Sequence, residues 1–151
     1  MPHFDYGYFS FSRKSNGKFD PVVQRKNLVK KRTIINKLLA NDMGKEFYDG
    51  KRINGYAGFK YDGRWQIFLK KIIKRYKLNN KSKVLDIGAK KGFFMHDLGK
   101  LLPGIKVYGV EDHYYPISKS MSSVKKKIKL KRFTDLNYKK NYFDFVHAHN
   151  S

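Results

Sequence analysis

The sequence predicts an α/β fold built on a mostly parallel, Rossmann-like sheet, and the order of its elements carries that prediction. Residues 83–88 (KVLDIG) form a short apolar run that ends in glycine, which is typical of a strand buried on both faces. A helical segment over 93–102 and a second apolar run over 106–110 follow. The order of strand, glycine turn, helix and strand indicates a βαβ unit, whose two strands are parallel.

The segments around this unit extend the prediction. Apolar residues recur at helical spacing over 65–76, and they are Trp65, Phe68, Leu69, Ile72, Ile73 and Tyr76. Beyond the second strand we expect a weaker helix within 116–127, a third strand over 128–133 and a fourth over 143–148. The strand order expected for this arrangement is 3-2-1-4.

Two parts are expected along the chain: a basic N-terminal extension over 1–64 and the Rossmann-like domain over 65–151. In the extension we expect a basic helix from Val22 to about Met43, and then a loop over 45–64 in which glycines alternate with aromatic residues. Asp62 is expected to be the N-cap of the helix that follows this loop.

Composition bounds the class of protein. The 34 Lys and Arg residues exceed the 12 Asp and Glu residues, which gives a net charge of +22 and favours polyanionic partners. A lysine-rich composition of the kind that an AT-rich genome produces explains the same charge without function. The chain has no cysteine, which excludes disulfides and cysteine-ligated metals. No segment resembles a signal peptide or a membrane span of about 20 apolar residues. We therefore predict a cytoplasmic protein.

The turn after the first strand and the end of the second strand carry the chemistry. Gly88 and Gly92 flank the turn, where glycine allows a sharp bend and a close approach of a ligand to the backbone. Glu111 ends the second strand, where a carboxylate can accept hydrogen bonds from both hydroxyls of a ribose. The G-x-G-x-x-G fingerprint is absent because Lys90 occupies its middle glycine position. This disfavours a pyrophosphate cofactor such as NAD and leaves room for a nucleoside without phosphates.

Several segments, in order, resemble class I S-adenosylmethionine-dependent methyltransferases. Residues 84–94 (VLDIGAKKGFF) resemble the first signature of that family, and residues 107–112 (VYGVED) resemble its second-strand signature. Residues 136–151 (LNYKKNYFDFVHAHNS) resemble the segment that leads into its fourth strand. Residues 54–65 (NGYAGFKYDGRW) are similar to the segment before the cofactor domain in a bacterial subgroup.

The resemblance implies S-adenosylmethionine as the cofactor. Its binding residues, carried over position by position, are Asp86, Gly88, Ala89, Gly92, Glu111 and Asp112. The first four would shape the methionine end of the pocket, Glu111 would hold the ribose, and Asp112 is the alternative ribose partner. No catalytic base is assigned.

Further positions near the expected site either have a possible role in the pocket or depart from the family pattern. Tyr115 would wall the adenine or serve packing, and Arg64 and Trp65 would line the cofactor or acceptor pocket. Lys90 and Lys91 depart from the family because they place two positive charges beside the site of a sulfonium cation. Arg132 is a further departure, because it lies near the position where many members place an acid that contacts the adenine amine.

The resemblance also predicts a truncated fold, because the sequence stops just after the fourth strand. That strand would then be an edge with unpaired backbone groups, which favours a homodimer through this edge. His147 and His149 alternate on it as His-x-His, so a metal pair is conceivable. Because no acid or cysteine is expected nearby, we predict ordinary strand histidines and no metal site.

Three functions are consistent with these observations. The first is methyl transfer from S-adenosylmethionine, by a whole enzyme or by a truncated or inactive copy, to a small-molecule or sugar acceptor. The second is a non-enzymatic basic protein that binds nucleic acid on a decayed cofactor-binding fold. The third is an NAD-dependent oxidoreductase, which the residue at Lys90 disfavours.

Overall fold

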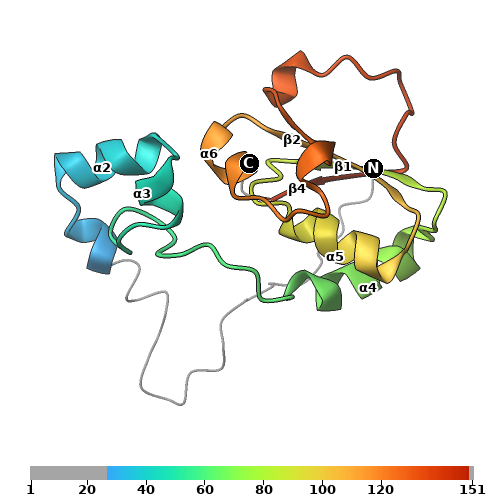
Figure 1. The fold of residues 1–151 in the computed structure, drawn as a ribbon, viewed down its shortest axis with the longest axis horizontal. Helices are drawn as coiled ribbons and strands as arrows, with labels where there is room; N and C mark the ends of the chain where they lie inside the picture. The colour runs from blue at the N-terminus through green and yellow to red at the C-terminus, as the bar shows by residue number, and fades with distance from the viewer. Residues whose placement is uncertain (1–26, 150–151) are drawn as a thin grey trace.

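The fold was analysed in a computed structural model that describes residues 27–149, and the sheet has the predicted topology (Figure 1). It consists of four parallel strands in the order β3-β2-β1-β4. The strands are β1 (Lys83–Ile87), β2 (Lys106–Glu111), β3 (Ile128–Leu130) and β4 (Phe145–Ala148). The α/β, Rossmann-like fold class and the 3-2-1-4 order are therefore confirmed.

Helices α4 (Trp65–Tyr76) and α5 (Phe93–Leu101) lie side by side on one face of the sheet (Figure 1). Their apolar stripes meet alternate residues of the strands, and the shared core contains Leu69, Ile72, Val84, Phe94, Met95, Leu98 and Val107. Full burial of one such aliphatic side chain contributes about 1.5–3 kcal/mol. The apolar residues whose helical spacing predicted these helices are thus residues that form this core.

The opposite face of the sheet is covered by aromatic side chains. Tyr108, whose side chain points away from α5, contacts the ring of Phe143 at a centroid distance of 5.5 Å and that of Tyr142 at 6.1 Å. Leu85 and Val146 are in register on this same face, and Val146 is 50% exposed. This face is therefore only partly covered, since Tyr108 is half-buried on β2 and Val146 is half exposed on β4.

The expected helix from Val22 to Met43 is wrong in its described part. Residues 27–30 are helical, but the helix ends there and a new one, α2 (Ile34–Asn41), begins. Thr33 is the N-cap of α2 and forms a reciprocal capping box with Asn36, which satisfies amides that a continuous helix would bond internally. Residues 22–26 of the expected helix, and the irregular segment expected over 1–20, lie outside the described residues.

Two further local expectations are corrected in the segment that precedes α4. The loop expected over 45–64 contains a single-turn helix, α3 (Lys45–Tyr48). Asp62 is not the N-cap of α4, because that position is taken by Arg64 in helical conformation, with no side-chain cap. The Asp62 carboxylate instead accepts hydrogen bonds from the amide and the guanidinium of Arg64. None of the described helices has the length and apolarity that a membrane crossing requires.

The helix expected within 116–127 is confirmed only at its start, since the α-helix there, α6 (Tyr114–Ser118), ends at Ser118. The hydroxyls of Ser118 and Ser120 donate to carbonyls of the preceding turn, which competes with continued helix formation. A 3₁₀ turn, η1 (Lys125–Lys127), leads into β3. The third strand is shorter than expected because a second 3₁₀ turn, η2 (Phe133–Asp135), follows it.

Candidate functional site

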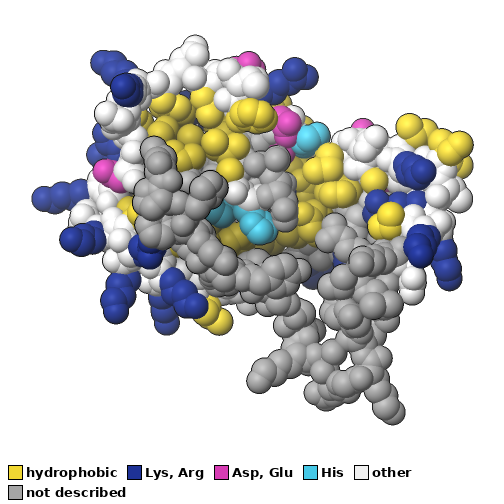
Figure 2. All heavy atoms as spheres, turned by 180° about the vertical axis from the view of Figure 1, so that it is seen from behind, with side chains coloured by type: hydrophobic (Ala, Val, Ile, Leu, Met, Phe, Trp, Pro, Cys, Tyr) yellow, Lys and Arg dark blue, Asp and Glu magenta, His cyan; other side chains and the backbone are white. Residues whose placement is uncertain are grey.

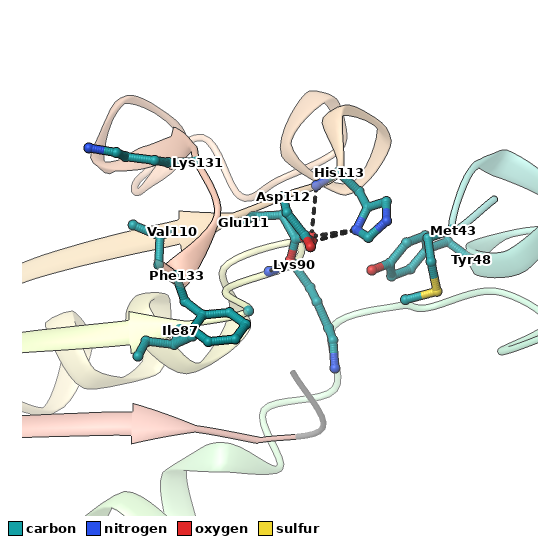
Figure 3. Close-up of a pocket in the computed structure, with 11 residues that line it drawn as sticks. Met43, Tyr48, Ile87, Lys90, Val110, Glu111, Asp112, His113, Lys131 and Phe133 are labelled. Atoms are coloured by element: carbon teal, nitrogen blue, oxygen red, sulfur yellow. Dashed lines mark hydrogen bonds and ion pairs between the residues drawn. The ribbon is translucent and has the colours of Figure 1, made fainter. Parts of the chain in front are cut away.

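A pocket lies at the carboxyl ends of β1, β2 and β3 (Figure 3). Ile87, Gly88 and Lys90 from β1 and its turn form one side, and the end of β2 forms another. The remaining lining residues are Met43, Tyr48, Val110, Glu111, Asp112, His113, Lys131 and Phe133. The chain runs outward from β1 to β3 and returns beside β1 as β4, so this edge of the sheet carries the topological switch point at which such folds bind ligands.

Glu111 is the buried acid of this pocket, with an exposed fraction of 3%. Its Oε2 accepts the Lys90 amide at 2.9 Å, and its Oε1 accepts the His113 amide at 3.0 Å and lies 3.2 Å from His113 Nδ1. Burial raises the pKa of Glu111, and the two amide hydrogen bonds oppose this effect. A carboxylate has about four lone-pair sites. Because the bonds to Lys90 and His113 fill three of them, Glu111 keeps capacity for a further donor.

The glycine turn is held by hydrogen bonds within the protein. Gly88, Lys90 and Gly92 all have positive φ, at 68°, 52° and 74°. The amide of Ala89 donates to the Val110 carbonyl at 3.0 Å, the amide of Lys90 donates to Glu111, and the amide of Gly92 donates to the Ala89 carbonyl at 2.8 Å. These amides are therefore committed, and the turn has less donor capacity for a ligand than its sequence indicates.

Gly92 also has a packing role. A side-chain Cβ at this position would lie 2.6 Å from Val124 Cγ2 and 3.0 Å from Ile128 Cδ1. The absent side chain thus makes room for the segment that leads into β3. Its cofactor role stays a prediction, as do those of Gly88 and Ala89.

Asp86 is 3% exposed and lies on the helix-covered face of β1. Its Oδ1 is 2.6 Å from His147 Nδ1 on β4, and the His147 ring stacks on Phe94 at a centroid distance of 3.9 Å. The expectation that no acid lies near His147 is wrong. The assignment of Asp86 to the methionine end of the pocket stays a prediction, because the pocket-lining residues do not include it.

Trp65 joins this histidine cluster edge-on. Its ring lies 5.2 Å from that of His147 and 5.4 Å from that of His149, and both planes are close to perpendicular to the indole. Burial lowers the pKa of His149, and the charges of His147 and Lys90 lower it further. The predicted place of Arg64 and Trp65 in a ligand pocket stays a prediction.

Lys90 and Lys91 are adjacent in sequence and have different surroundings. The Lys90 side chain runs along the pocket (Figure 3), and its Nζ donates to the His149 carbonyl at 3.2 Å. The Lys91 side chain is directed to the extension, where its Nζ lies 2.8 and 2.9 Å from the two carboxylate oxygens of Asp49. The positive charge of Lys91, which the resemblance would place beside a sulfonium cation, is thus paired with the Asp49 carboxylate.

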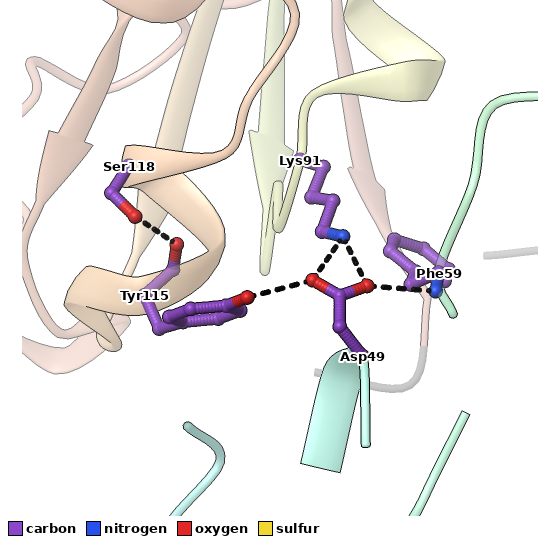
Figure 4. Close-up of polar contacts among 5 residues, drawn as sticks. All are labelled: Asp49, Phe59, Lys91, Tyr115 and Ser118. Atoms are coloured by element: carbon purple, nitrogen blue, oxygen red, sulfur yellow. Dashed lines mark hydrogen bonds and ion pairs between the residues drawn. The ribbon is translucent and has the colours of Figure 1, made fainter. Parts of the chain in front are cut away.

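Asp49 joins the extension to the Rossmann-like domain (Figure 4). Besides Lys91, it accepts the Tyr115 hydroxyl at 2.8 Å and the Phe59 amide at 3.2 Å. Burial alone would raise the pKa of Asp49, but the hydrogen bonds from Lys91, Tyr115 and the Phe59 amide, with the Lys91 charge, lower it. Tyr115 therefore has a docking role here, and its ring also stacks on Tyr48 at 6.2 Å.

The sequence prediction missed several pocket residues, and His113, which follows the predicted acids Glu111 and Asp112, is one of them. Met43 and Tyr48 come from the extension, and nothing in their local pattern distinguishes them from packing residues. Lys131 and Phe133 follow the third strand, and their position at the carboxyl end of a parallel strand was the available signal. Phe133 is 61% exposed, which leaves an aromatic ring uncovered at the pocket.

The end of β2 brings two acids and a histidine together. Ligand atoms of Glu111, Asp112 and His113 all lie within 4.8 Å of one another, and His113 Nδ1 is 2.6 Å from Asp112 Oδ1. The histidine nitrogen between the two carboxylates accounts for this arrangement without an ion. The sequence-based assignment of no metal site stays a prediction.

On the face that Figure 2 shows, the basic side chains of the described residues do not gather into one patch. Lysine and arginine project mainly around the rim, while hydrophobic side chains and histidines occupy the middle of that face. A single electrostatic footprint for nucleic acid would require clustering on one surface. The described part of this face therefore does not strengthen the nucleic-acid alternative.

This chain is similar to known proteins in structure and not in sequence. No protein-family model matches this sequence, and no curated protein is significantly similar to it. A SAM-dependent methyltransferase from Aquifex aeolicus is similar in structure, with 20% identity and a TM-score of 0.41 over 59% of this chain. Coclaurine N-methyltransferase bound to N-methylheliamine and SAH is also similar, with 15% identity and a TM-score of 0.47 over 86% of this chain.

The chain spans 57% of the length of the first of these proteins and 43% of the second. Similarities at this level do not carry an activity from one protein to another, because one fold serves many functions. The parallel 3-2-1-4 sheet, with its pocket at the carboxyl ends of the strands, is what identifies this chain as an α/β, Rossmann-like protein.

Proposed function

We propose that this chain binds S-adenosylmethionine and belongs to a methyl-transferring enzyme. The observation that carries the proposal is the place of Glu111: a buried carboxylate at the carboxyl end of β2 that lines the pocket and accepts a hydrogen bond from the Lys90 amide in the glycine turn after β1. In a parallel sheet of this order, that position faces the ribose of a bound nucleoside. The sequence resemblance of residues 84–94 and 107–112 supports the same ligand.

The residues present fit a nucleoside with a free diol. Glu111 has acceptor capacity for one further donor, and the exposed ring of Phe133 offers a stacking surface for an adenine. The second ribose hydroxyl would donate to Asp112, whose side chain is 50% exposed. Alternatively, it would displace His113 Nδ1 from Glu111 Oε1 and donate to that oxygen. Asp112 is therefore an additional partner in this proposal.

A pyrophosphate cofactor fits the same turn poorly. Its recognition depends on backbone amides that point at the phosphates from a glycine-rich turn. Here the amides of Ala89, Lys90 and Gly92 are bonded to acceptors within the protein. This supports S-adenosylmethionine over NAD.

When bound, S-adenosylmethionine supplies an electrophilic methyl group on a sulfonium. The contribution that we assign to the chain is orientation: Glu111 fixes the ribose and the turn at 88–92 limits where the methionine end lies. Alignment of this kind accelerates a transfer between two bound groups without a catalytic base. We propose a small-molecule acceptor, with a sugar as the first class to examine, on the basis of the resemblance of residues 54–65.

Calorimetric titration tests the proposal. S-adenosylhomocysteine and S-adenosylmethionine should bind, NAD should bind at least tenfold more weakly, and adenosine should compete with S-adenosylhomocysteine. Tighter binding of NAD, or no binding of either adenosyl ligand by a folded protein, would contradict it. Random RNA titrated at low and high salt tests the polyanion alternative, because phosphate contacts weaken steeply as salt increases.

A further inference from the structure

Tyr48 is a buried polar residue whose hydroxyl has no partner among the described residues. Its exposed fraction is 0%, and its Oη is one of the buried side-chain atoms without a hydrogen bond in the described part of the chain. Buried hydroxyls are almost always hydrogen-bonded, so an exception calls for a physical account. Tyr48 also lines the pocket, and its hydroxyl points toward the side where Lys90 and Glu111 lie (Figure 3).

The position of the Tyr48 ring is fixed by its surroundings. It stacks between Tyr56, at a centroid distance of 5.7 Å, and Tyr115, at 6.2 Å. Its carbonyl accepts the amides of Gly58 and Phe59 at 3.0 Å each. Asp49, the next residue in the chain, is held by Lys91 (Figure 4). The backbone on the C-terminal side of Tyr48 is therefore fixed to the rest of the protein. The hydroxyl therefore cannot turn to another acceptor by a simple rotation of the side chain.

The hydroxyl stays protonated across the physiological range. Burial, followed by the neighbouring charge of Glu111, raises the pKa of Tyr48. A neutral phenol in this position is a hydrogen-bond donor, whereas Glu111 across the pocket is an acceptor. A donor and an acceptor that face one space are complementary to a ligand hydroxyl, which accepts from one and donates to the other.

We propose that Tyr48 is a ligand-binding residue that donates a hydrogen bond to a ribose hydroxyl of the nucleoside held by Glu111. Helix α3 of the extension is thus one wall of the cofactor site. This inference rests on the proposed function, since it places Tyr48 at the ribose of the same ligand.

Substitution Tyr48→Phe removes the hydroxyl and keeps the ring. In calorimetric titrations we expect S-adenosylhomocysteine to bind about three- to tenfold more weakly, the range for one neutral hydrogen bond. The thermal midpoint of the ligand-free variant should equal or exceed that of the original protein, because the substitution deletes an unpaired polar atom. Tyr56→Phe is the matched control, since Tyr56 belongs to the same aromatic stack and is not among the pocket-lining residues. The Tyr56→Phe variant should bind S-adenosylhomocysteine with unchanged affinity.

A ribose contact also predicts a change in ligand selectivity. The original protein should prefer adenosine to 2′-deoxyadenosine or 3′-deoxyadenosine, and Tyr48→Phe should reduce one of these two preferences by the same three- to tenfold factor. If Tyr48 had only a structural role, Tyr48→Phe would weaken the binding of adenosine and of both deoxyadenosines equally, and that outcome overturns the proposal. Unchanged affinity in a folded Tyr48→Phe variant overturns it as well, while binding by the original protein leaves the proposed function standing. If the original protein binds neither adenosyl ligand, both inferences fall together.

Discussion

The βαβ unit over 83–111 and the aromatic segment of the extension over 45–59 hold together by different means. The first is packed by apolar side chains that recur at the period of a strand or a helix, with Met95 and Leu98 fully buried. The second is docked by a few polar and aromatic contacts centred on Asp49 and Tyr48. Loss of one core residue should therefore affect the whole molecule, whereas loss of one docking contact should release a local segment.

Leu98→Ala is expected to have the largest effect. Leu98 is fully buried in the shared core, so truncation leaves a cavity and should lower the free energy of unfolding by about 2–5 kcal/mol. Leu38→Ala in α2 is the matched control, because Leu38 is 63% exposed and its loss should change stability by less than about 0.5 kcal/mol. Urea titration measures both, and similar values for the two variants would contradict the contrast.

The glycine pair at 92 and 63 separates backbone strain from packing. Both glycines have φ near +70°, so alanine costs about 1–2 kcal/mol at either position. Only at Gly92 would the new Cβ lie within 3.0 Å of a core side chain, since at Gly63 the nearest atom is 3.5 Å away. Gly92→Ala should therefore cost about 2–4 kcal/mol and Gly63→Ala about 1–2 kcal/mol. Equal losses in thermal unfolding would show that Val124 and Ile128 move aside freely.

Glu111→Ala should weaken binding of S-adenosylhomocysteine by about 1.5–3 kcal/mol, the range for hydrogen bonds to a charged group. Asp112→Ala is the control and should have the smaller effect, because its side chain is 50% exposed. A larger loss at Asp112 would move the main ribose contact one residue along the chain. Since the pKa of Glu111 is raised, affinity should begin to fall on acidification at a pH above the ordinary glutamate value of 4.5.

Lys91→Met tests the docking contact. Asp49 would keep its bonds from Tyr115 and Phe59, so we expect a loss of about 1–2 kcal/mol, confined to the extension. Hydrogen exchange should become faster in α3 and remain slow in β1 and β2. Lys126→Met, at an exposed lysine, should leave both regions unchanged. Faster exchange throughout the sheet would mean that the two regions unfold together.

Acid should have the same local effect. The pKa of Asp49 is lowered in the folded protein, so its contribution to docking is present above the ordinary value of 3.8 and is lost as the pH falls through the lowered pKa. Protection of α3 should decrease in that range in the original protein and change less in Lys91→Met. An equal decrease in both proteins would assign the acid sensitivity to another group.

The smallest expected effect on stability is at β4. Within residues 27–149 this strand pairs only with β1, and Val146 is half exposed. The homodimer through this edge stays a prediction. If it forms, it should increase with salt as the net charge of +22 is screened, and Val146→Lys should abolish it with little change in the melting midpoint. Light scattering that shows a monomer at all salt concentrations would contradict it.

The same contrast explains what the sequence could predict. The strands and the helices α4 and α5 follow from local periodicity, and the 3-2-1-4 order follows from the βαβ unit and the resemblance. The break before α2 had a visible signal in Thr33 and Asn36, but Asn replaces the usual Glu or Gln of a capping box. The ion pair of Lys91 with Asp49 joins distant segments and has no local signature, so only the folded chain reveals it.

The anchoring of α3 beside the pocket makes ligand binding and docking thermodynamically reciprocal. If docking raises the affinity for the nucleoside by some factor, the nucleoside must raise the docking equilibrium by the same factor. If the proposed nucleoside binds, protease resistance of the segment around Asp49 would report pocket occupancy, whatever reaction the protein catalyses. Candidate cofactors and inhibitors can be ranked in this way by how slowly a protease cuts the extension.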